Sequence, residues 1–181
     1  MARPRTVDRE RLLDAAETVV ARSSAAALTF GSLATEAGVP KASVQSAFGT
    51  REALIDAMLN RWLGREQARF DQALAGATEP RARILAHIQT TADEPPEESK
   101  RVAPLMAALV ETPDRNSSSA KWYASRIGDL SADSEEARRL RIAFLAAEGT
   151  YYLRHLIGFE MSDDVWREIF DDLRNLANAS G

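Results

Sequence analysis

The feature that most constrains this chain is the order of helix-starting and helix-ending residues in LTFGSLATEAGVPKASVQSAFGTREAL, residues 28–54. Thr29 is a good N-cap for a short helix, and Gly38 can end that helix because glycine adopts a left-handed conformation without strain. Pro40 can open a second helix, since its missing N–H is not needed in a first turn. Thr50 then caps a third helix. The stretch predicts successive helices joined by tight turns.

Two cations, Lys41 and Arg51, stand at the starts of these predicted helices. A cation is misplaced there because a helix N-terminus already carries a partial positive charge, so both residues indicate an anionic partner. Residues 1–51 hold seven Lys and Arg against five Asp and Glu, whereas the remainder holds 16 against 22. The N-terminal part has a net charge of +2 and the rest −6. This is the direction expected if only the first part faces phosphate.

The composition limits the class of protein. With 181 residues and 45% hydrophobic content, the chain can bury a core. It has no cysteine, which excludes disulfides, thiolate metal sites and a cysteine nucleophile. No apolar signal region follows MARPR, and no run approaches the roughly 18 apolar residues of a membrane span. We therefore expect a soluble, cytoplasmic protein.

Helical periodicity extends along the whole chain, and no strand alternation interrupts it. We expect an all-α fold with nine helices. The first lies at about 8–23 and the next three follow the caps described above. Breaks rich in proline and acid, at 77–80 and 93–100, lie on either side of the fifth helix. We expect the later helices at about 81–91, 101–111, 118–130, 133–158 and 162–179.

The segment EAGVP joins the two short helices, and the second of them has a polar face opposite Val44 and Phe48. Two helices so arranged have the form of a helix-turn-helix, whose second helix enters the DNA major groove. Gln45 can pair with adenine there, and Ser43 or Ser46 can donate to bases or phosphates. An ordinary helix hairpin inside a bundle is the alternative.

RERLLDAAETVVAR and LTFGSLATEAGVPKASVQSAFGTREALI resemble, in order and spacing, the DNA-binding domain of the tetracycline-repressor (TetR) family of bacterial transcription regulators. AFLAAEGTYYLRHLIGFEMSDDVWREIFDDL is similar to the two final helices through which one branch of the family dimerises. The resemblance implies a helix-turn-helix DNA-binding domain in residues 1–52 and a helical effector-binding and dimerisation domain in 53–181. It also implies a bacterial cytoplasmic regulator that is not an enzyme and needs no cofactor.

The resemblance implies that the Thr29 position caps the second helix, that KASVQS reads the groove and that the Arg51 position, usually lysine, contacts phosphate. The expected DNA-binding residues are Arg3, Arg5, Thr29, Lys41, Ala42, Ser43, Gln45, Ser46 and Arg51. The chain departs from the family where a glycine-threonine pair is replaced by Ala42 and Ser43, and where an aromatic phosphate contact is replaced by Gln45. These departures predict a lower affinity for DNA or a different operator sequence.

The segment 133–158 is apolar on two faces, whereas a surface helix needs only one. Small residues on the second face would let another helix approach closely, which predicts an isologous four-helix interface in a homodimer. Its candidate residues are Ala143, Ala146, Thr150, Leu153, Ile157, Trp166, Phe170 and Leu173. A two-fold dimer presents two recognition helices about one duplex turn apart, which suits a palindromic operator. Burial inside one subunit is the alternative.

The central helices carry enough aromatic and polar side chains to wall an apolar cavity for a small-molecule effector. The candidate ligand-binding residues are Trp62, His87, Met106, Trp122, Tyr123, Arg126, Phe144, Glu148 and Tyr151. Glu148 interrupts the apolar run FLAAEGTYYL, and a buried carboxylate needs a partner. That partner is either Arg126 or another internal cation, or a polar group of the effector. Packed core is the alternative for the whole set.

These observations predict a DNA-binding transcriptional regulator, a repressor released from its operator by a small apolar effector. One alternative is a dimeric all-α interaction protein that has lost specific DNA binding. The other is a helical enzyme using Glu148, Tyr151 and His155, which lacks a convergent acid-base set. Neither His87 nor His155 has a carboxylate at metal-helix spacing, so no metal site is expected.

Overall fold

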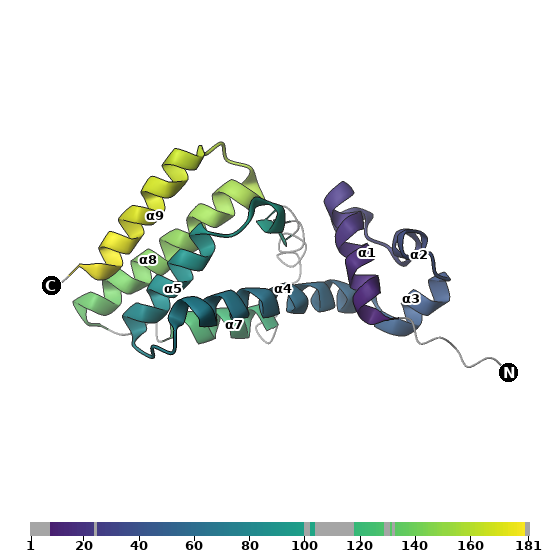
Figure 1. The fold of residues 1–181 in the computed structure, drawn as a ribbon, viewed down its shortest axis with the longest axis horizontal. Coiled ribbons are helices and arrows are strands. Elements are labelled where there is room, and N and C mark those ends of the chain that lie inside the picture. The colour runs from purple at the N-terminus through teal and green to yellow at the C-terminus, as the bar shows by residue number, and fades with distance from the viewer. Residues whose placement is uncertain are drawn as a thin grey trace. The chain divides into compact units, whose positions relative to one another are not determined.

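The structure is a computed structural model. It describes residues 8–23, 25–99, 102–103, 118–128, 131 and 133–179. All regular secondary structure in these ranges is helical (Figure 1), which confirms the prediction of an all-α fold. Arg3, Arg5 and Met106 lie outside the described residues, as does most of the helix expected at 101–111.

The described residues divide into two compact units. The first comprises the residues up to Trp62 together with 102–103, and the second comprises 63–99 and the described residues from 118 onward. The first contains α1 (Arg9–Arg22), the 3-10 turn η1 (Ala25–Ala27), α2 (Phe30–Ala37), α3 (Lys41–Phe48) and the start of α4 (Arg51–Leu74). The second contains the rest of α4, α5 (Pro80–Ala92), α7 (Ser118–Ile127), α8 (Glu135–Tyr151), the π-helix η2 (Tyr152–Ile157) and α9 (Asp163–Asn178). The division of functions after residue 52 stays a prediction.

The predicted caps of the first unit are present. Thr29 and Ser32 form a reciprocal capping box: Ser32 N donates to Thr29 Oγ1 at 3.0 Å, and Thr29 N donates to Ser32 Oγ at 2.9 Å. Gly38 ends α2 in the left-handed region, with φ 65°. Pro40 is the N-cap of α3 rather than its first residue, and Thr50 Oγ1 accepts from Ala53 N at 3.1 Å in the first turn of α4.

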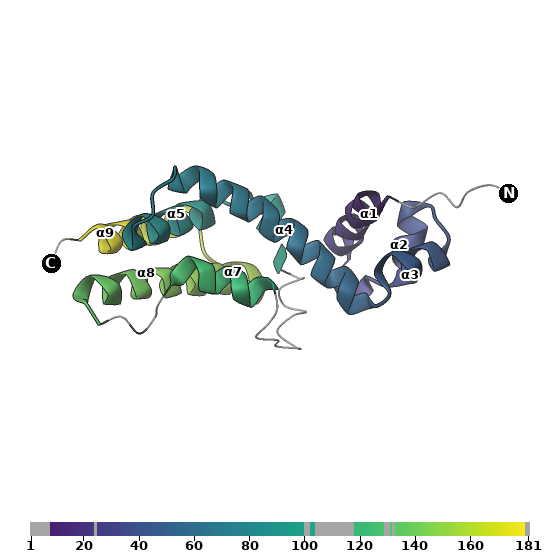
Figure 2. The same cartoon turned by 90° about the horizontal axis from the view of Figure 1, so that it is seen from below.

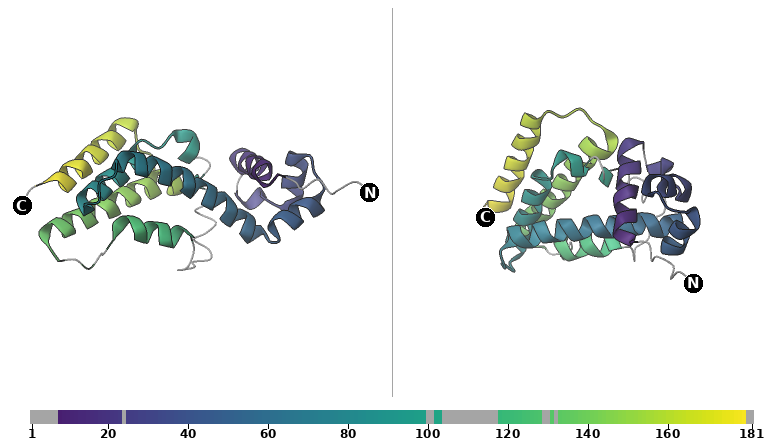
Figure 3. Two further views of the ribbon diagram at one scale, coloured as in Figure 1. Left: turned by 60° about the horizontal axis from the view of Figure 1, so that its bottom comes forward. Right: turned by 45° about the vertical axis from the view of Figure 1, so that its right-hand side comes forward.

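The core of the first unit is formed by the apolar faces of its helices. Figure 3 shows these helices as a group in purple and blue. Fully buried members are Leu12, Ala16, Leu28, Leu33, Val44 and Leu54. Val44 and Phe48 turn one face of α3 into this core. The opposite face of the helix is therefore left at the surface.

In the second unit, α5 packs against α8 and α9, and α8 packs against α9 (Figure 2). The helix expected to run to residue 158 changes character after Tyr151, where the hydrogen-bonding pattern becomes that of a π-helix. Gly158 ends this π-helix with φ 74°, a conformation that glycine adopts without strain. Ser162 then caps α9 by accepting from Val165 N at 3.2 Å.

Candidate DNA-binding face and effector site

The solvent-facing side of α3 carries most of the residues expected to contact DNA. Lys41, Ala42, Gln45 and Ser46 are exposed, and Ser43 is half-buried. All five lie on an eight-residue helix whose other face is held in the core. The geometry thus presents short and polar side chains from a rigid base, as a recognition helix requires.

Arg51 has an internal partner that the sequence did not predict. Its Nε donates to the backbone oxygen of Leu28 at 2.9 Å, and its side chain is half-buried. Because Leu28 immediately precedes the N-cap of α2, this bond ties the first turn of α4 to the start of the helix-turn-helix. The phosphate contact expected of Arg51 stays a prediction. Thr29 uses its hydroxyl in the cap of α2, and its contact with DNA is likewise a prediction.

A set of ion pairs between α4 and α1 also links the helices of the first unit, and the sequence did not predict it. Arg61 on α4 faces three carboxylates of α1: its Nη2 lies 2.6 Å from Asp14 Oδ1, its Nε 3.6 Å from Glu10 Oε2 and its Nη1 3.8 Å from Glu17 Oε1. The spacing of these acids, at i, i+4 and i+7 of one helix, marks a single acidic face. That spacing was the available signal.

Glu148 on α8 has two protein partners. Tyr123 of α7 donates its hydroxyl to Oε2 at 2.8 Å, and His87 Nε2 of α5 lies 2.7 Å from Oε1. The His87 ring stacks on Phe144 at a centroid distance of 4.5 Å. The side chain of Glu148 is 26% exposed. The sequence analysis considered Arg126 as an internal partner. The groups that hydrogen-bond to Glu148 are His87 and Tyr123, while Arg126 interacts with Glu148 through charge.

Burial sets the protonation of the groups around this carboxylate. Burial, and then the charge of Glu148, raise the pKa of Tyr123 well above its usual value. Burial, and then the charge of Glu94, likewise raise the pKa of Tyr151. Both phenols are therefore neutral at physiological pH, and the Tyr123 hydroxyl remains a hydrogen-bond donor.

Arg126 lies in the same unit but binds elsewhere. Its guanidinium carbon is 3.9 Å from the ring centroid of Phe70 and 3.8 Å from that of Trp122, and its Nη2 donates to the backbone oxygen of Glu66 at 3.1 Å. The side chain is only 2% exposed. Burial lowers its pKa to about 10, so the group is still cationic at neutral pH.

The predicted ligand-binding residues fall into groups that differ in exposure. His87, Phe144 and Tyr151 are buried, whereas Trp122, Tyr123 and Glu148 are half-buried. The rings of His87, Trp122, Tyr123 and Phe144 form an aromatic cluster around the Glu148 carboxylate, whereas the Tyr151 ring contacts His155. Trp62 is also buried, but it belongs to the first unit, whereas the other described residues of this set belong to the second.

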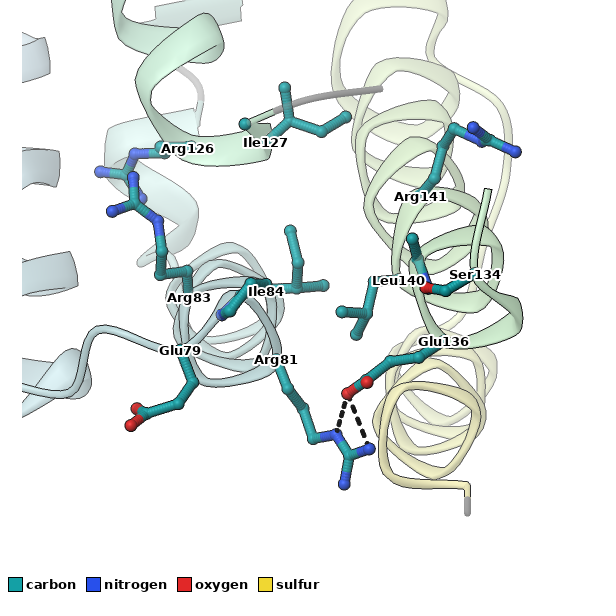
Figure 4. A pocket seen from close by; sticks show the side chains of 13 residues that line it. Glu79, Arg81, Arg83, Ile84, Arg126, Ile127, Ser134, Glu136, Leu140 and Arg141 are labelled. Atoms are coloured by element: carbon teal, nitrogen blue, oxygen red, sulfur yellow. Dashed lines mark hydrogen bonds and ion pairs between the residues drawn. The ribbon is translucent and has the colours of Figure 1, made fainter. Parts of the chain in front are cut away.

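A pocket of about 610 Å³ lies where α5 and α8 begin and α7 ends (Figure 4). Of the predicted ligand-binding residues that the structure describes, Arg126 is the one that lines it. Sequence reasoning missed this pocket because its walls come from the ends of three helices. No motif or spacing within one segment marks such a site.

The residues expected at a dimer interface divide into buried and exposed sets. Phe170 of α9 is 0% exposed, and Ala143, Thr150, Trp166 and Leu173 are also buried within the single chain. They present almost no surface in the single chain. Their place at a dimer interface stays a prediction. Ala146 is half-buried, while Leu153 and Ile157 are exposed. Further exposed apolar side chains, not predicted, are Ile142, Leu145, Tyr152, Phe159 and Val165.

A helix-turn-helix unit with an exposed recognition face, followed by a separate helical unit, defines the class of DNA-binding transcriptional regulators. Residues 81–178, more than half of the chain, match the family described as tetracyclin repressor-like, C-terminal domain. The chain therefore belongs to the TetR family. Regulators of this family bind DNA and small-molecule ligands, form dimers and are not enzymes.

Solved structures of similar fold agree with this assignment. The multidrug binding protein EbrR, complexed with imidazole, has 24% identity and a TM-score of 0.68, with 94% of this chain and 93% of that chain covered. A transcriptional regulator from Streptomyces coelicolor A3(2) has 18% identity and a TM-score of 0.69, covering 94% and 98%. A TetR-family protein from Rhodococcus sp. has 18% identity and a TM-score of 0.70, with the same coverage.

Comparison with curated proteins finds no match. In the described part of the chain, no helix is both long enough and apolar enough to cross a membrane.

Proposed function

We propose that this protein is a homodimeric repressor that binds a palindromic operator through α3 and is released by a small aromatic effector. The observation that carries the proposal is the exposed polar face of α3, anchored by buried Val44 and Phe48 in a capped helix-turn-helix. A face of this kind suits insertion into the major groove.

On the DNA side, each residue of α3 has a role that its chemistry suits. Gln45 can make a bidentate pair with adenine, and Ser43 and Ser46 can donate to bases or phosphates. Lys41 lies in the first turn of α3, and we expect it to bind a phosphate. Arg51 contacts phosphate while its Nε keeps the bond to Leu28.

On the effector side, we assign the aromatic cluster around Glu148 to ligand binding. The carboxylate is held by a tyrosine and a histidine rather than by a bonded arginine, so it can stabilise a cationic or hydrogen-bond-donating group on an aromatic molecule. Structures of EbrR complexed with malachite green and with ethidium, both aromatic cations, support this chemical class.

Release from DNA follows as a shift in population. One conformation of the protein binds DNA and another does not. An effector with higher affinity for the second conformation tilts α4 and moves Arg51 together with the recognition helix. By linkage, operator DNA must weaken effector binding by the same factor.

Dimerisation uses the exposed apolar side chains of α8, η2 and α9. Ile142 and Leu145 lie one turn apart on α8, and Val165 adds an exposed apolar side chain from α9. Exposed apolar side chains of this kind suit a protein interface.

A selection of bound sequences from a random DNA pool tests the DNA half of the proposal. We expect a palindrome whose half-sites lie about one duplex turn, roughly 34–36 Å, apart. A single half-site would rule out the symmetric dimer on DNA, and no enrichment would rule out specific recognition.

The effector half of the proposal is tested by titrating ethidium with and without the selected operator. An unchanged affinity for ethidium would show that the cluster around Glu148 does not control DNA binding.

One alternative has an observation in its favour. Ala42 and Gln45 replace residues that the family commonly uses on DNA, which suits an interaction protein without specific DNA binding. The two functions differ in salt dependence, because each neutralised phosphate adds about 0.9 to the logarithmic salt slope. A flat salt response would favour the interaction protein.

A further inference from the structure

The proposed function makes no use of the pocket at the ends of α5, α7 and α8. Figure 4 shows Ile84 of α5 and Leu140 of α8 directed into the space between these helices, with Ile127 of α7 on a third side. Pro80 and Ala137 add to the apolar lining. The volume of about 610 Å³ lies within the roughly 300–1,000 Å³ of pockets that hold small organic ligands.

Around this apolar lining, positively charged side chains outnumber negatively charged ones. Among the described lining residues, four are arginines and two are glutamates: Arg81, Arg83, Arg126 and Arg141, with Glu79 and Glu136. Arg81 Nη2 lies 2.8 Å from Glu136 Oε1, so the charges of these two lining residues neutralise each other (Figure 4). Glu79 Oε2 accepts from Thr78 N at 3.1 Å, and Figure 4 shows its carboxylate directed away from the pocket.

The hydrogen bonds of two lining arginines go to neutral atoms. Arg83 donates to the backbone oxygen of Ser125, and Arg126 donates to that of Glu66. A carbonyl oxygen satisfies a donor without cancelling its charge, so Arg83 keeps its positive charge. The charge of Arg126 faces those of Glu66 and Glu148. The 13-residue α5 and the 17-residue α8 both begin at this pocket, and two helix N-termini add partial positive charge, against the single C-terminus of α7.

We propose that this pocket is a second ligand site, which binds an organic anion with an apolar body. An aromatic carboxylate is the simplest case: its ring packs on Ile84, Ile127 and Leu140, and its carboxylate meets the guanidinium of Arg83, a pairing whose geometry favours two parallel hydrogen bonds. The site is distinct from the cluster around Glu148 and selects the opposite charge. Its ligand therefore differs in class from the effector proposed above.

Binding of 2-naphthoate to the full-length protein, measured by calorimetry without DNA, tests the proposal. Because no operator is present, the result is independent of the proposed repressor function. Arg83→Gln, which removes a cation, should weaken binding at least tenfold. Ala137→Phe, which fills the pocket from α8, should abolish binding. Arg138→Gln is the matched control, since Arg138 is exposed on α8 and does not line the pocket; it should bind within twofold of the unaltered chain.

The same measurement includes 2-naphthylmethylammonium, which has the same ring with the opposite charge. A saturating concentration of this cation should leave the affinity for 2-naphthoate unchanged within twofold. Displacement of 2-naphthoate by the cation would overturn the proposal, because the two would share one site. Absence of 2-naphthoate binding, or equal binding by Arg83→Gln and Arg138→Gln, would overturn it as well.

Discussion

The Tyr123 hydroxyl donates a hydrogen bond of 2.8 Å to Oε2 of Glu148, and this bond joins α7 to α8. Burial, followed by the charge of Glu148, raises the pKa of Tyr123, so the donor stays protonated. The other carboxylate oxygen lies 2.7 Å from His87 Nε2 of α5. The carboxylate thus holds three helices of the second unit together while 26% of its side chain remains exposed.

Glu148→Gln should weaken binding of an aromatic cation while leaving binding of a neutral aromatic molecule nearly unchanged. The amide keeps the size of the side chain but removes its negative charge. We expect ethidium affinity to fall about tenfold, which corresponds to about 1.4 kcal/mol. Fluorescence titration measures this loss. An equal loss for a neutral aromatic molecule would mean that the substitution disturbs packing rather than charge recognition.

Gln45→Ala should relax the sequence preference at one base step. The exposed amide pairs with a single base, so its loss should cost about 1 to 3 kcal/mol on the best operator and little on random DNA. Competition binding on both DNAs measures the difference. Lys41→Ala is the control, since loss of a phosphate contact weakens binding uniformly. Uniform loss in the Gln45 variant would assign Gln45 to the DNA backbone.

Arg51→Ala should affect both DNA binding and stability. Losing one phosphate contact should lower the logarithmic salt slope by about 1. Losing the hydrogen bond to Leu28 should lower the free energy of unfolding by about 1 kcal/mol. DNA titrations at several salt concentrations, together with denaturant unfolding, measure the two effects. A lower stability with an unchanged salt slope would show that Arg51 has a structural role, linking α4 to the start of α2, and does not contact phosphate.

Leu145→Glu should dissociate the dimer. Leu145 is 54% exposed in the single chain, and burying a carboxylate at an interface without a partner is costly. Sedimentation velocity should find monomer at concentrations where the unaltered protein is dimeric. Ala68→Glu, which adds the same charge to an exposed alanine of α4, should stay dimeric. A dimeric Leu145 variant would place the interface elsewhere.

His155 should make the protein less stable in mild acid. Its ring lies against Tyr151 and Trp166, and burial, followed by the charge of Arg154, lowers its pKa. The folded protein then binds this proton less readily than the unfolded chain, so the free energy of unfolding falls as pH drops below about 6.5. His155→Gln should reduce this fall between about pH 7 and 5. Identical pH profiles of the variant and the unaltered protein would argue against this contribution.

Local chemistry in the sequence determined the helices and most of their ends. Thr29, Gly38 and Thr50 act within a few residues of themselves, so their positions alone predict where α2 ends and where α2 and α4 begin. The buried face of α3 also follows from spacing, because Val44 and Phe48 are four residues apart on one side of a helix. The family resemblance rests on the same short-range pattern.

Only the tertiary structure decided which distant side chains meet. The partners of Glu148 come from residues 25 and 61 positions away, and Arg51 finds the Leu28 oxygen 23 positions away. Periodicity gives α9 an apolar face, but it does not say whether that face packs on its own subunit or on a partner; Phe170 is buried because α5 and α8 cover it. The arginine-lined pocket is defined by three helix ends that no local pattern relates, since a cavity is the space left after packing.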